Sequence, residues 1–339
     1  MIATTNQQKF SAQTFEFRCE VVQPIKLNQH KGAALRGALF NSLRKAGCSH
    51  RELTSCRPCE LVAECPVSFL LATVDNDGRR GGDVPRPFVI NPPLDEANIF
   101  QVGEQLNFGL TLFARSVRFL PYLIVAMQNI EREGLGVQPD ATPGAWRRGA
   151  IRVREIIARN SLSSQEQIIF KIGRRYLDAP ENPITHSQVL QLATTTVPNG
   201  VRRLHFTFHT PTHLVTNGRA LQQPDFPVLV QRLIERVSSL SAQYGQAELD
   251  LDFEALMYEA RQVLLVEDCT KWEPVRSYSQ RQGRDLSLGG FVGEATFAGR
   301  VDNLLPLLIW GQLTHVGKDA TKGNGWYSLD FDPPAEVKC

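Results

Sequence analysis

The succession of apolar periodicities is the feature of this sequence that most restricts its fold. Residues 14–24 alternate as a strand does, and residues 30–46 carry leucines at i, i+4 and i+8 that predict a helix ended by Gly47. Two strand patterns, a second helical pattern and further strand patterns complete the first half. This half approximates strand, helix, two strands, helix, strand, which is the β-α-β-β-α-β order of ferredoxin-like and RNA-recognition-motif domains.

The second half starts the same order again, with a strand pattern over residues 202–215 that Pro211 interrupts. The elements expected after it are amphipathic helices over 226–245 and 252–268, a hairpin of 271–282 with 286–299, a short helix over 303–314 and a last strand over 325–331. We therefore predict an α+β fold with two tandem ferredoxin-like (RRM-like) domains, residues 1–195 and 196–339. Residues 190–200 are expected to form the linker, and a cysteine-rich insertion (about residues 48–85) is expected in the first domain.

Charge and hydropathy exclude some classes of function. The formal net charge of +2 gives no overall polyanion-binding signal, so a nucleic-acid site has to come from local clusters such as the arginine pairs at 147–148 and 202–203. Such pairs are also typical of a solvated surface. The most apolar runs, FLPYLIVAM and LLPLLIW, are well short of the roughly 20 residues of a membrane span. The first ten residues lack the apolar core of a signal peptide. We expect a cytoplasmic protein without a membrane partner.

Four of the seven cysteines lie in one short stretch, at Cys48, Cys56, Cys59 and Cys65. Without a secretion signal, such crowding favours a metal site or structural thiols over a disulfide framework. The Cys56-x2-Cys59 pair is a common zinc half-site, and four thiolates complete a tetrahedral shell. We predict a structural zinc ion held by these four residues, with His50 as an alternative to Cys48. An iron–sulfur cluster and unliganded buried thiols are the alternatives to zinc.

Residues 311–327, GQLTHVGKDATKGNGWY, are rich in glycine and could hold a phosphate. The spacing excludes a P-loop, because five residues separate Gly311 from Gly317 and an aspartate stands where the Mg²⁺-binding hydroxyl is needed. It also excludes the dinucleotide fingerprint, which needs a third glycine and a following helix. What remains is a glycine-rich loop whose backbone amides can approach a phosphate. Its aromatic residues, Trp326 and Tyr327, either stack on bases or belong to the core of the last strand.

Seven stretches, in their order along the chain, resemble those of one family. They are KGAALRGALFNSLRKAG, CRPCELVAECPVSFLLAT, PRPFVINPP, LNFGLTLF, HTPTHLV, LGGFVGEATFAG and LLPLLIWGQLTHVGKDATKGNGWY. The chain resembles a RAMP (repeat-associated mysterious protein) of the type that cuts precursor CRISPR repeat RNA into guide RNAs. The resemblance implies ferredoxin-like domains, CRISPR repeat RNA or crRNA as the ligand, and other CRISPR effector subunits as further partners.

The resemblance also implies a chemistry. The 2′-hydroxyl before the scissile bond attacks the adjacent phosphate without a catalytic metal or other catalytic cofactor, and the products carry a 2′,3′-cyclic phosphate and a 5′-hydroxyl. This reaction needs a base, an acid and a cation beside the phosphate. Two other interpretations stay open: a non-cleaving subunit that holds crRNA in an effector complex, and a zinc-stabilised protein-interaction scaffold that binds no RNA.

Family members often place a catalytic histidine near the first helix of the N-terminal domain, where His30 lies in this sequence. A helix N-terminus attracts phosphate and favours a neutral imidazole that can act as a base. The resemblance therefore points to His30, with Lys31 beside it for the phosphate charge, although His30 could also only cap the helix. His315, on the glycine-rich loop, is the second acid–base candidate, and a loop-shaping hydrogen bond is its alternative role.

The residues expected to bind RNA come from both halves of the chain. They are Arg36, Arg202, Arg203, Gly317, Lys318, Lys322, Gly323 and Gly325. The cationic side chains would neutralise phosphates, and the glycines would offer backbone amides. His205, His209 and His213 fall at even spacing and would share one face of a strand. We expect a solvated or RNA-facing surface there in preference to a metal site, because Pro211 should bend the strand before His213.

Overall fold

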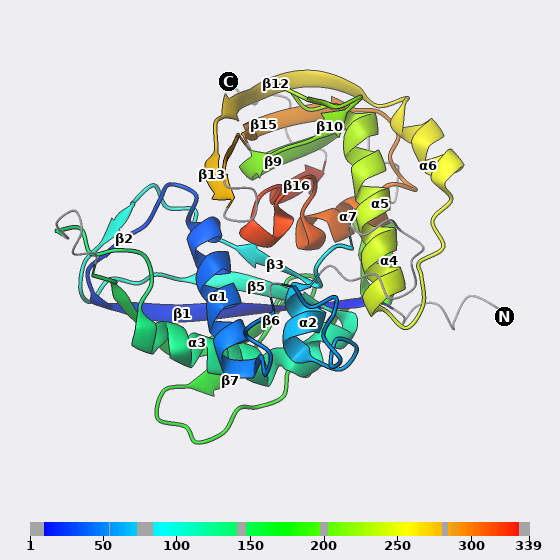
Figure 1. The fold of residues 1–339 in the computed structure, drawn as a ribbon. Helices are drawn as coiled ribbons and strands as arrows, with labels where there is room; N and C mark the ends of the chain where they lie inside the picture. The colour runs from blue at the N-terminus through cyan, green and yellow to red at the C-terminus, as the bar shows by residue number, and fades with distance from the viewer. Residues whose placement is uncertain are drawn as a thin grey trace. The chain divides into compact units, whose positions relative to one another are not determined.

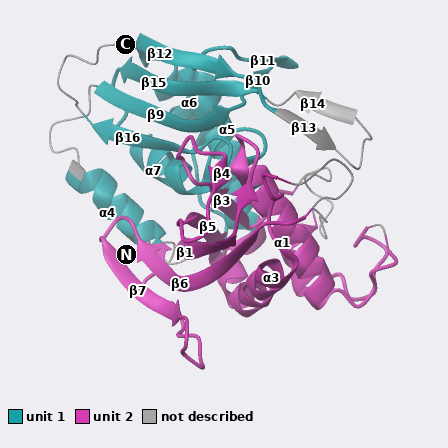
Figure 2. Cartoon of the chain, turned by 90° about the vertical axis from the view of Figure 1, so that its left-hand side faces the viewer, with its two compact units in different colours: residues 1–10, 185–242, 247–339 teal, residues 11–184, 243–246 magenta. Residues whose placement is uncertain are grey.

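Figure 1 shows the fold as a computed structural model, which describes residues 10–53, 55–72, 84–140, 147–196, 203–279, 284–287 and 289–331. The fold is mixed α+β with antiparallel sheets. The chain divides into two compact units, coloured separately in Figure 2. Unit 2 comprises residues 11–184 and 243–246, and unit 1 comprises residues 1–10, 185–242 and 247–339. Among the described residues, no helix combines the length and the apolar character that a membrane span needs.

Unit 2 holds the first seven strands and the first three α-helices. They are β1 (Ser11–Gln23), β2 (Ile25–Lys26), α1 (Lys31–Gly47), α2 (Pro66–Leu71), β3 (Phe88–Asn91), β4 (Ile99–Phe100), β5 (Phe108–Phe113), the 3₁₀ helix η1 (Ala114–Phe119), α3 (Leu120–Glu133), β6 (Ala150–Asn160) and β7 (Gln165–Lys171). The strand β8 (Ile184–Thr185) and the helix α4 (His186–Thr196) follow.

The main sheet of unit 2 has the strand order β3-β5-β1-β6-β7. β1 is central, and it pairs antiparallel with β5 from Ala12↔Phe113 to Phe17↔Phe108 and with β6 from Thr14↔Arg159 onward. Helix α1 connects β1 to β3, and helix α3 connects β5 to β6. The unit therefore contains the succession β-α-β-β-α-β, with its four strands placed in the sheet as second, third, first and fourth.

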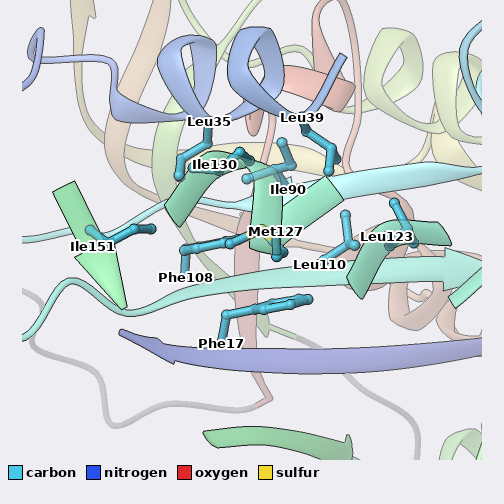
Figure 3. Close-up of a pocket in the computed structure, with 10 residues that line it drawn as sticks. All are labelled: Phe17, Leu35, Leu39, Ile90, Phe108, Leu110, Leu123, Met127, Ile130 and Ile151. Atoms are coloured by element: carbon cyan, nitrogen blue, oxygen red, sulfur yellow. The ribbon is translucent and has the colours of Figure 1, made fainter. Parts of the chain in front are cut away.

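The core of unit 2 lies between the helices α1 and α3 and the sheet. In Figure 3, Leu35 and Leu39 of α1 point toward Met127 of α3, and Phe108 and Phe17 of the sheet lie beneath them. The rings of Phe17 and Phe108 stack with their centroids 5.0 Å apart. The cavity that these side chains leave is about 10 Å³, which is room for one water at most. This apolar pocket is therefore part of the packed core and not a ligand site.

Unit 1 holds the later elements of the chain. They are β9 (Arg203–Thr212), β10 (Val215–Thr216), β11 (Arg219–Ala220), α5 (Phe226–Tyr244), α6 (Phe253–Ala260), β12 (Leu264–Glu273), β13 (Arg276–Ser279), β14 (Arg284–Ser287), β15 (Gly290–Ala298), α7 (Leu305–Thr314), the 3₁₀ helix η2 (Ala320–Lys322) and β16 (Tyr327–Phe331). The last two residues of α5 are grouped with unit 2.

The main sheet of unit 1 has the strand order β12-β15-β9-β16. Helices α5 and α6 lie between β9 and β12 in the chain, and α7 lies between β15 and β16, so the strand placement of unit 2 recurs. Phe206 of β9 is paired with residues of both neighbouring strands and packs edge-on against Phe297 of β15 at 5.4 Å. Helix α7 is tied to α4 within this unit, because Trp310 Nε1 donates a 2.9 Å hydrogen bond to His186 Nδ1.

The structure corrects two expectations about the second half of the chain. The helix expected over 252–268 ends at Ala260, and the residues after it form β12. The expected hairpin is also different: β12 pairs with β15 from Leu264↔Ala298 to Glu273↔Gly290, and β13 with β14 form a shorter hairpin between them. The apolar residues 264–266 fit either period, and pairing with β15 makes them a strand. Residues 190–196 of the expected linker belong to α4, and the rest of it lies outside the described residues.

Candidate functional site

The first candidate lies at the start of α1 in unit 2. His30 is the N-cap residue of this 17-residue helix and is partly buried. Its backbone, with φ −88° and ψ 77°, is outside the helical region. Within α1 as described, no backbone amide donates a capping hydrogen bond to the imidazole. His30 therefore occupies the N-cap position through its backbone alone, and both its catalytic and its capping role stay predictions.

Lys31, the next residue, is buried, with 3% of its surface exposed. Its Nζ donates a 2.6 Å hydrogen bond to the backbone oxygen of Asp95 and lies 3.7 Å from Asp95 Oδ1. Asp95 belongs to the segment between β3 and β4, which Leu27 N also holds through a 2.8 Å hydrogen bond to Asn98 O. In this structure the charge of Lys31 is paired with Asp95 inside unit 2. The role expected for Lys31 beside the phosphate stays a prediction.

The arginines expected to bind RNA have different surroundings. Arg36 lies on α1 with its guanidinium carbon 4.9 Å from the centroid of the Phe40 ring. At this distance the cation is attracted to the face of the ring. Arg203 is the first residue of β9 and is partly buried, whereas Arg202 lies outside the described residues. The contribution of these arginines to RNA binding stays a prediction.

The glycine-rich loop, residues 315–326, closes on itself in unit 1. Val316 N donates a 3.0 Å hydrogen bond to Gly325 O, and Gly325 N donates a 3.1 Å hydrogen bond to Pro211 O of β9. Gly325 has a φ of 73°, and a Cβ atom there would lie 1.8 Å from Val316 O. Glycine is needed at this position because the two ends of the loop touch through their backbones.

The other two glycines of the loop also serve its packing. Gly317 has a φ of 83°, and a Cβ atom there would lie 2.4 Å from His213 O. Gly323 has a φ of 90°, and its amide donates a 3.0 Å hydrogen bond to Ala320 O. The amides of Gly323 and Gly325 are therefore used within the protein. The expectation that these two amides cradle a phosphate stays a prediction, and it would require these hydrogen bonds to open.

The lysines of the loop differ in their availability. Lys322 Nζ lies 3.1 Å from Asp319 Oδ1, which partly neutralises its charge. The amide of Lys318 donates a 3.2 Å hydrogen bond to His213 O, and its side chain is exposed. Of the predicted RNA-binding side chains that the structure describes, Lys318 alone is exposed. It is therefore the loop residue best placed to meet a phosphate.

His315, the second acid–base candidate, lies in the core of unit 1. It is fully buried, and its ring lies parallel to Trp326 at 6.1 Å. Burial, with the charge of Arg236 as the next cause, lowers the pKa of His315 to about 3. A buried imidazole that stays neutral near pH 7 neither touches RNA nor supplies a proton to a leaving group. Tyr327 is buried as well, and its hydroxyl donates a 2.8 Å hydrogen bond to Leu308 O, which confirms the core interpretation for this residue.

The three histidines of the β9 region bind neighbouring groups and not one another. His205 Nδ1 lies 3.1 Å from Thr296 Oγ1, and His209 Nε2 lies 2.9 Å from Ser328 Oγ. His213 is buried, and burial lowers the pKa of His209. β9 runs through residue 211 to Thr212 and ends before His213. Its pairing with β15 is irregular between Phe208 and Thr212, the stretch that contains the proline, as the expected interruption requires. These hydrogen bonds account for the histidines of β9 as residues that stabilise the sheet.

The four clustered cysteines lie in unit 2 between α1 and α2. Cys48 is the C-cap residue of α1, and Cys65 is the N-cap residue of α2. Cys59 N donates a 3.1 Å hydrogen bond to Cys56 O, and the four thiols are free. As the side chains stand, the described part of the chain contains no group of three or more His, Cys, Asp or Glu placed to hold a metal ion. The zinc site therefore stays a prediction.

Two residues that organise these sites were not identified from the sequence. Asp95 holds Lys31 from 64 positions away, and no spacing pattern marks such a distant partner. Arg236 of α5 donates a 2.6 Å hydrogen bond from Nε to Thr314 O at the end of α7. A signal for Arg236 does exist, because it borders the apolar stripe of an amphipathic helix and needs a partner there.

Two family patterns match this chain. A domain family named AF_1859_N, described as an N-terminal domain, matches residues 10–182. The family described as CRISPR-associated endoribonuclease Cas6 matches residues 206–327. The second match contains most of β9, from residue 206 onward, and the whole glycine-rich loop. No curated protein matches the sequence.

Solved structures have the same fold at low sequence identity. A partial Cas6-RT-Cas1–Cas2 complex has a chain that is 11% identical, with a TM-score of 0.61 over 98% of this chain and 48% of that one. A Cas6 product complex is 14% identical, with a TM-score of 0.52 over 95% of this chain and 99% of the other. A Thermus thermophilus Cas6 is 14% identical, with a TM-score of 0.51 over 95% and 98%. This chain thus spans about half the length of the first of these proteins and nearly all of the other two.

Proposed function

The chain belongs to the family of CRISPR-associated Cas6 endoribonucleases, and we propose on that premise that it binds CRISPR repeat RNA and cleaves the precursor transcript into guide RNAs. The observation that supports the proposal most directly is the Cas6 match over residues 206–327. The proposal includes two ferredoxin-like domains, for which the strand order in both sheets is the support.

The proposed reaction is a transesterification that needs no catalytic metal. O2′ of the nucleotide before the scissile bond forms a bond to phosphorus, and the bond from phosphorus to O5′ breaks. A base takes the proton of the 2′-hydroxyl and an acid gives a proton to the leaving O5′, so the products are a 2′,3′-cyclic phosphate and a 5′-hydroxyl. His30 is the residue that we assign to proton transfer, because Lys31 and His315 are both buried.

Lys318 is the loop side chain that we assign to the RNA backbone. It is exposed, and the hydrogen bond from its amide to His213 O fixes the position from which the side chain leaves the loop. Arg36, on the helix that follows His30, is proposed as a second phosphate contact. Such contacts add affinity that falls as salt rises, and they carry little sequence preference.

A second function deserves a test because the structure leaves one histidine of the predicted catalytic group accessible. Without a second acid or base, the chain would bind crRNA and hold it without cutting, as a subunit of a CRISPR effector complex. Other CRISPR proteins are the partners that we propose in either case. The solved Cas6-RT-Cas1–Cas2 complex, which contains a chain of the same fold, is the support for such partners.

The test uses labelled repeat RNA in EDTA with the wild-type chain, His30→Ala and the control Gln29→Ala, an exposed residue on the same turn. We expect wild type and control to cleave, and His30→Ala to bind RNA while cleaving on the order of 10²–10⁴-fold more slowly. Cleavage by His30→Ala at the wild-type rate would contradict the assignment of His30. Binding without cleavage by the wild type would favour the effector subunit, and no binding would favour the protein-interaction scaffold.

A further inference from the structure

The cysteine segment between α1 and α2 has no hydrophobic core of its own. Of residues 49–53 and 55–64, none is buried, and Leu61 has 48% of its surface exposed. Ordering a backbone residue costs about 1–2 kcal/mol of conformational entropy, and burial of apolar side chains usually offsets that cost. A segment that buries so little apolar surface needs another source of order.

The two ends of the segment are fixed to unit 2. Cys48 and Cys65 are both partly buried against its hydrophobic core. Arg44 of α1 donates hydrogen bonds from Nη2 to the backbone oxygens of Arg51 (2.8 Å) and Leu53 (2.5 Å). Arg51 in turn donates from Nε to Cys48 O at 3.4 Å. These bonds fold the first part of the segment back along the last turn of α1.

The middle of the segment is folded toward the same place. Cys56 hydrogen bonds to the side chain of Ser68, which is a buried residue of α2. The hydrogen bond from Cys59 N to Cys56 O closes a turn that brings the second cysteine of the pair back to the first. The four cysteines therefore gather around one side of the contact between α1 and α2.

We propose that Cys48, Cys56, Cys59 and Cys65 bind one zinc ion, which cross-links the 49–64 segment to the ends of α1 and α2. The side chains as they stand do not form a metal group. Each thiol can move by rotation about one side-chain bond, and the proposal requires that this rotation brings the four sulfurs together around the ion. Four cysteine ligands fill a tetrahedral shell and leave no open position, so the ion has a structural role.

The zinc ion would supply the stabilisation that the segment does not obtain from apolar burial. The four ligands lose their protons on binding, and the ion joins Cys56 and Cys59 of the segment to Cys48 and Cys65 at its two ends. Metal sites supply folding free energy where burial is insufficient. The proposal is independent of RNA cleavage, because unit 2 would need this cross-link whether or not the chain is a nuclease.

The experiment measures zinc in the purified full-length chain by elemental analysis, after growth with zinc and desalting. The variants are Cys56→Ser and Cys59→Ser, and the control is Cys19→Ala, which removes a thiol buried in β1 outside the segment. We expect one zinc per chain in the wild type and in Cys19→Ala, and a loss of at least about half of it in each of the other two variants. Full zinc occupancy in Cys56→Ser and Cys59→Ser would overturn the proposal.

Two measurements on the wild type keep the test independent of how well the variants fold. Cobalt added to the zinc-free chain should give the absorption bands of a tetrahedral thiolate site, and zinc should remove them. Trypsin should cut the 49–64 segment after Arg51 faster after zinc removal than before it. A colourless cobalt protein, an iron–sulfur spectrum, disulfides among the four cysteines, or a cleavage rate unchanged by zinc removal would each overturn the proposal.

Discussion

Replacing Gly325 by alanine tests whether the glycine-rich loop is built for packing. The structure places Val316 O 1.8 Å from the position of the new Cβ, far inside the roughly 3.5 Å at which non-bonded carbon contacts become favourable. The obstacle is a backbone carbonyl and not the end of a flexible side chain, so the loop itself has to move. Two hydrogen bonds depend on the present arrangement: the one from Val316 N to Gly325 O and the one from Gly325 N to Pro211 O.

The expected loss of stability follows from these contacts. Alanine at a φ of 73° costs about 1–2 kcal/mol from backbone strain. Each of the two hydrogen bonds contributes about 1 kcal/mol net when it is lost to solvent. We therefore expect Gly325→Ala to lower the free energy of unfolding by about 3 kcal/mol.

Gly218→Ala is the matched control within the same unit. Gly218 has a φ of 75° in the Asn217-Gly218 turn between β10 and β11, and a Cβ there would meet nothing within 4 Å. This variant has the backbone strain without the collision, so its expected cost is about 1 kcal/mol. The measurement is urea unfolding followed by tryptophan fluorescence, which reports mainly on unit 1 because three of the four tryptophans are in its sequence.

The result that refutes this reasoning is a Gly325→Ala chain as stable as Gly218→Ala. Equal stability together with lost RNA binding would mean that the glycine serves the ligand and that the loop is open in solution. A loss of stability about 2 kcal/mol greater than that of the control, from the two hydrogen bonds, supports a closed loop. Binding of RNA by Gly325→Ala should then fall only to the extent that the loop unfolds.

Three further outcomes follow from buried polar groups. Lys31→Met should destabilise unit 2 by about 1–3 kcal/mol in urea unfolding, because Asp95 loses its donor. The control Lys45→Met, which breaks an exposed ion pair, should cost less than about 1 kcal/mol. Equal effects of the two substitutions would contradict the structure. In the folded chain the pKa of His315 is lowered to about 3, so below pH 6.5 the unfolded chain binds the proton more readily. The free energy of unfolding should therefore decrease as the pH is lowered, by up to about 1.4 kcal/mol per pH unit. His315→Asn, which tolerates positive φ, should flatten that dependence between pH 6.5 and 5, and an unchanged slope would exclude His315 as its source. Trp310→Phe should cost about 1 kcal/mol by removing the donor to His186, and a thermal midpoint equal to that of the wild type would show that the bond contributes nothing.

The elements that the sequence predicts correctly are those whose periodicity reports burial directly. Leu35, Leu39 and Leu43 recur at i, i+4 and i+8, and all three are buried where α1 meets the core. The helix prediction for the residues after Ala260 is wrong for the opposite reason. The apolar residues there fit a helix as well as a strand, and the partner that decides between them, β15, lies some thirty residues further along the chain. A local pattern holds no information about that pairing.

The residues of the candidate site likewise include some that the sequence predicts and some that it does not. The position of His30 at the start of α1 was predictable, because the leucine pattern and the chain before it mark where the helix begins. The burial of Lys31 was not predictable, since it depends on Asp95 in a segment with no periodicity. His315 is similar: its neighbours include Arg236, which reaches it from a different helix.

The glycine-rich loop shows why a family motif and a binding site need not be the same thing. Its glycines are fixed by contacts with the backbones of Val316 and His213, so any substitution there disturbs the turn between α7 and β16. A sequence pattern kept for that reason identifies chains with the same packing, whatever they bind. The binding chemistry then falls to side chains that the packed loop holds outward, and among the described residues of the loop Lys318 is such a cation. Exchanging Lys318 for methionine should therefore weaken RNA binding and reduce its salt dependence while leaving the stability of unit 1 within about 0.5 kcal/mol, as expected for a surface substitution.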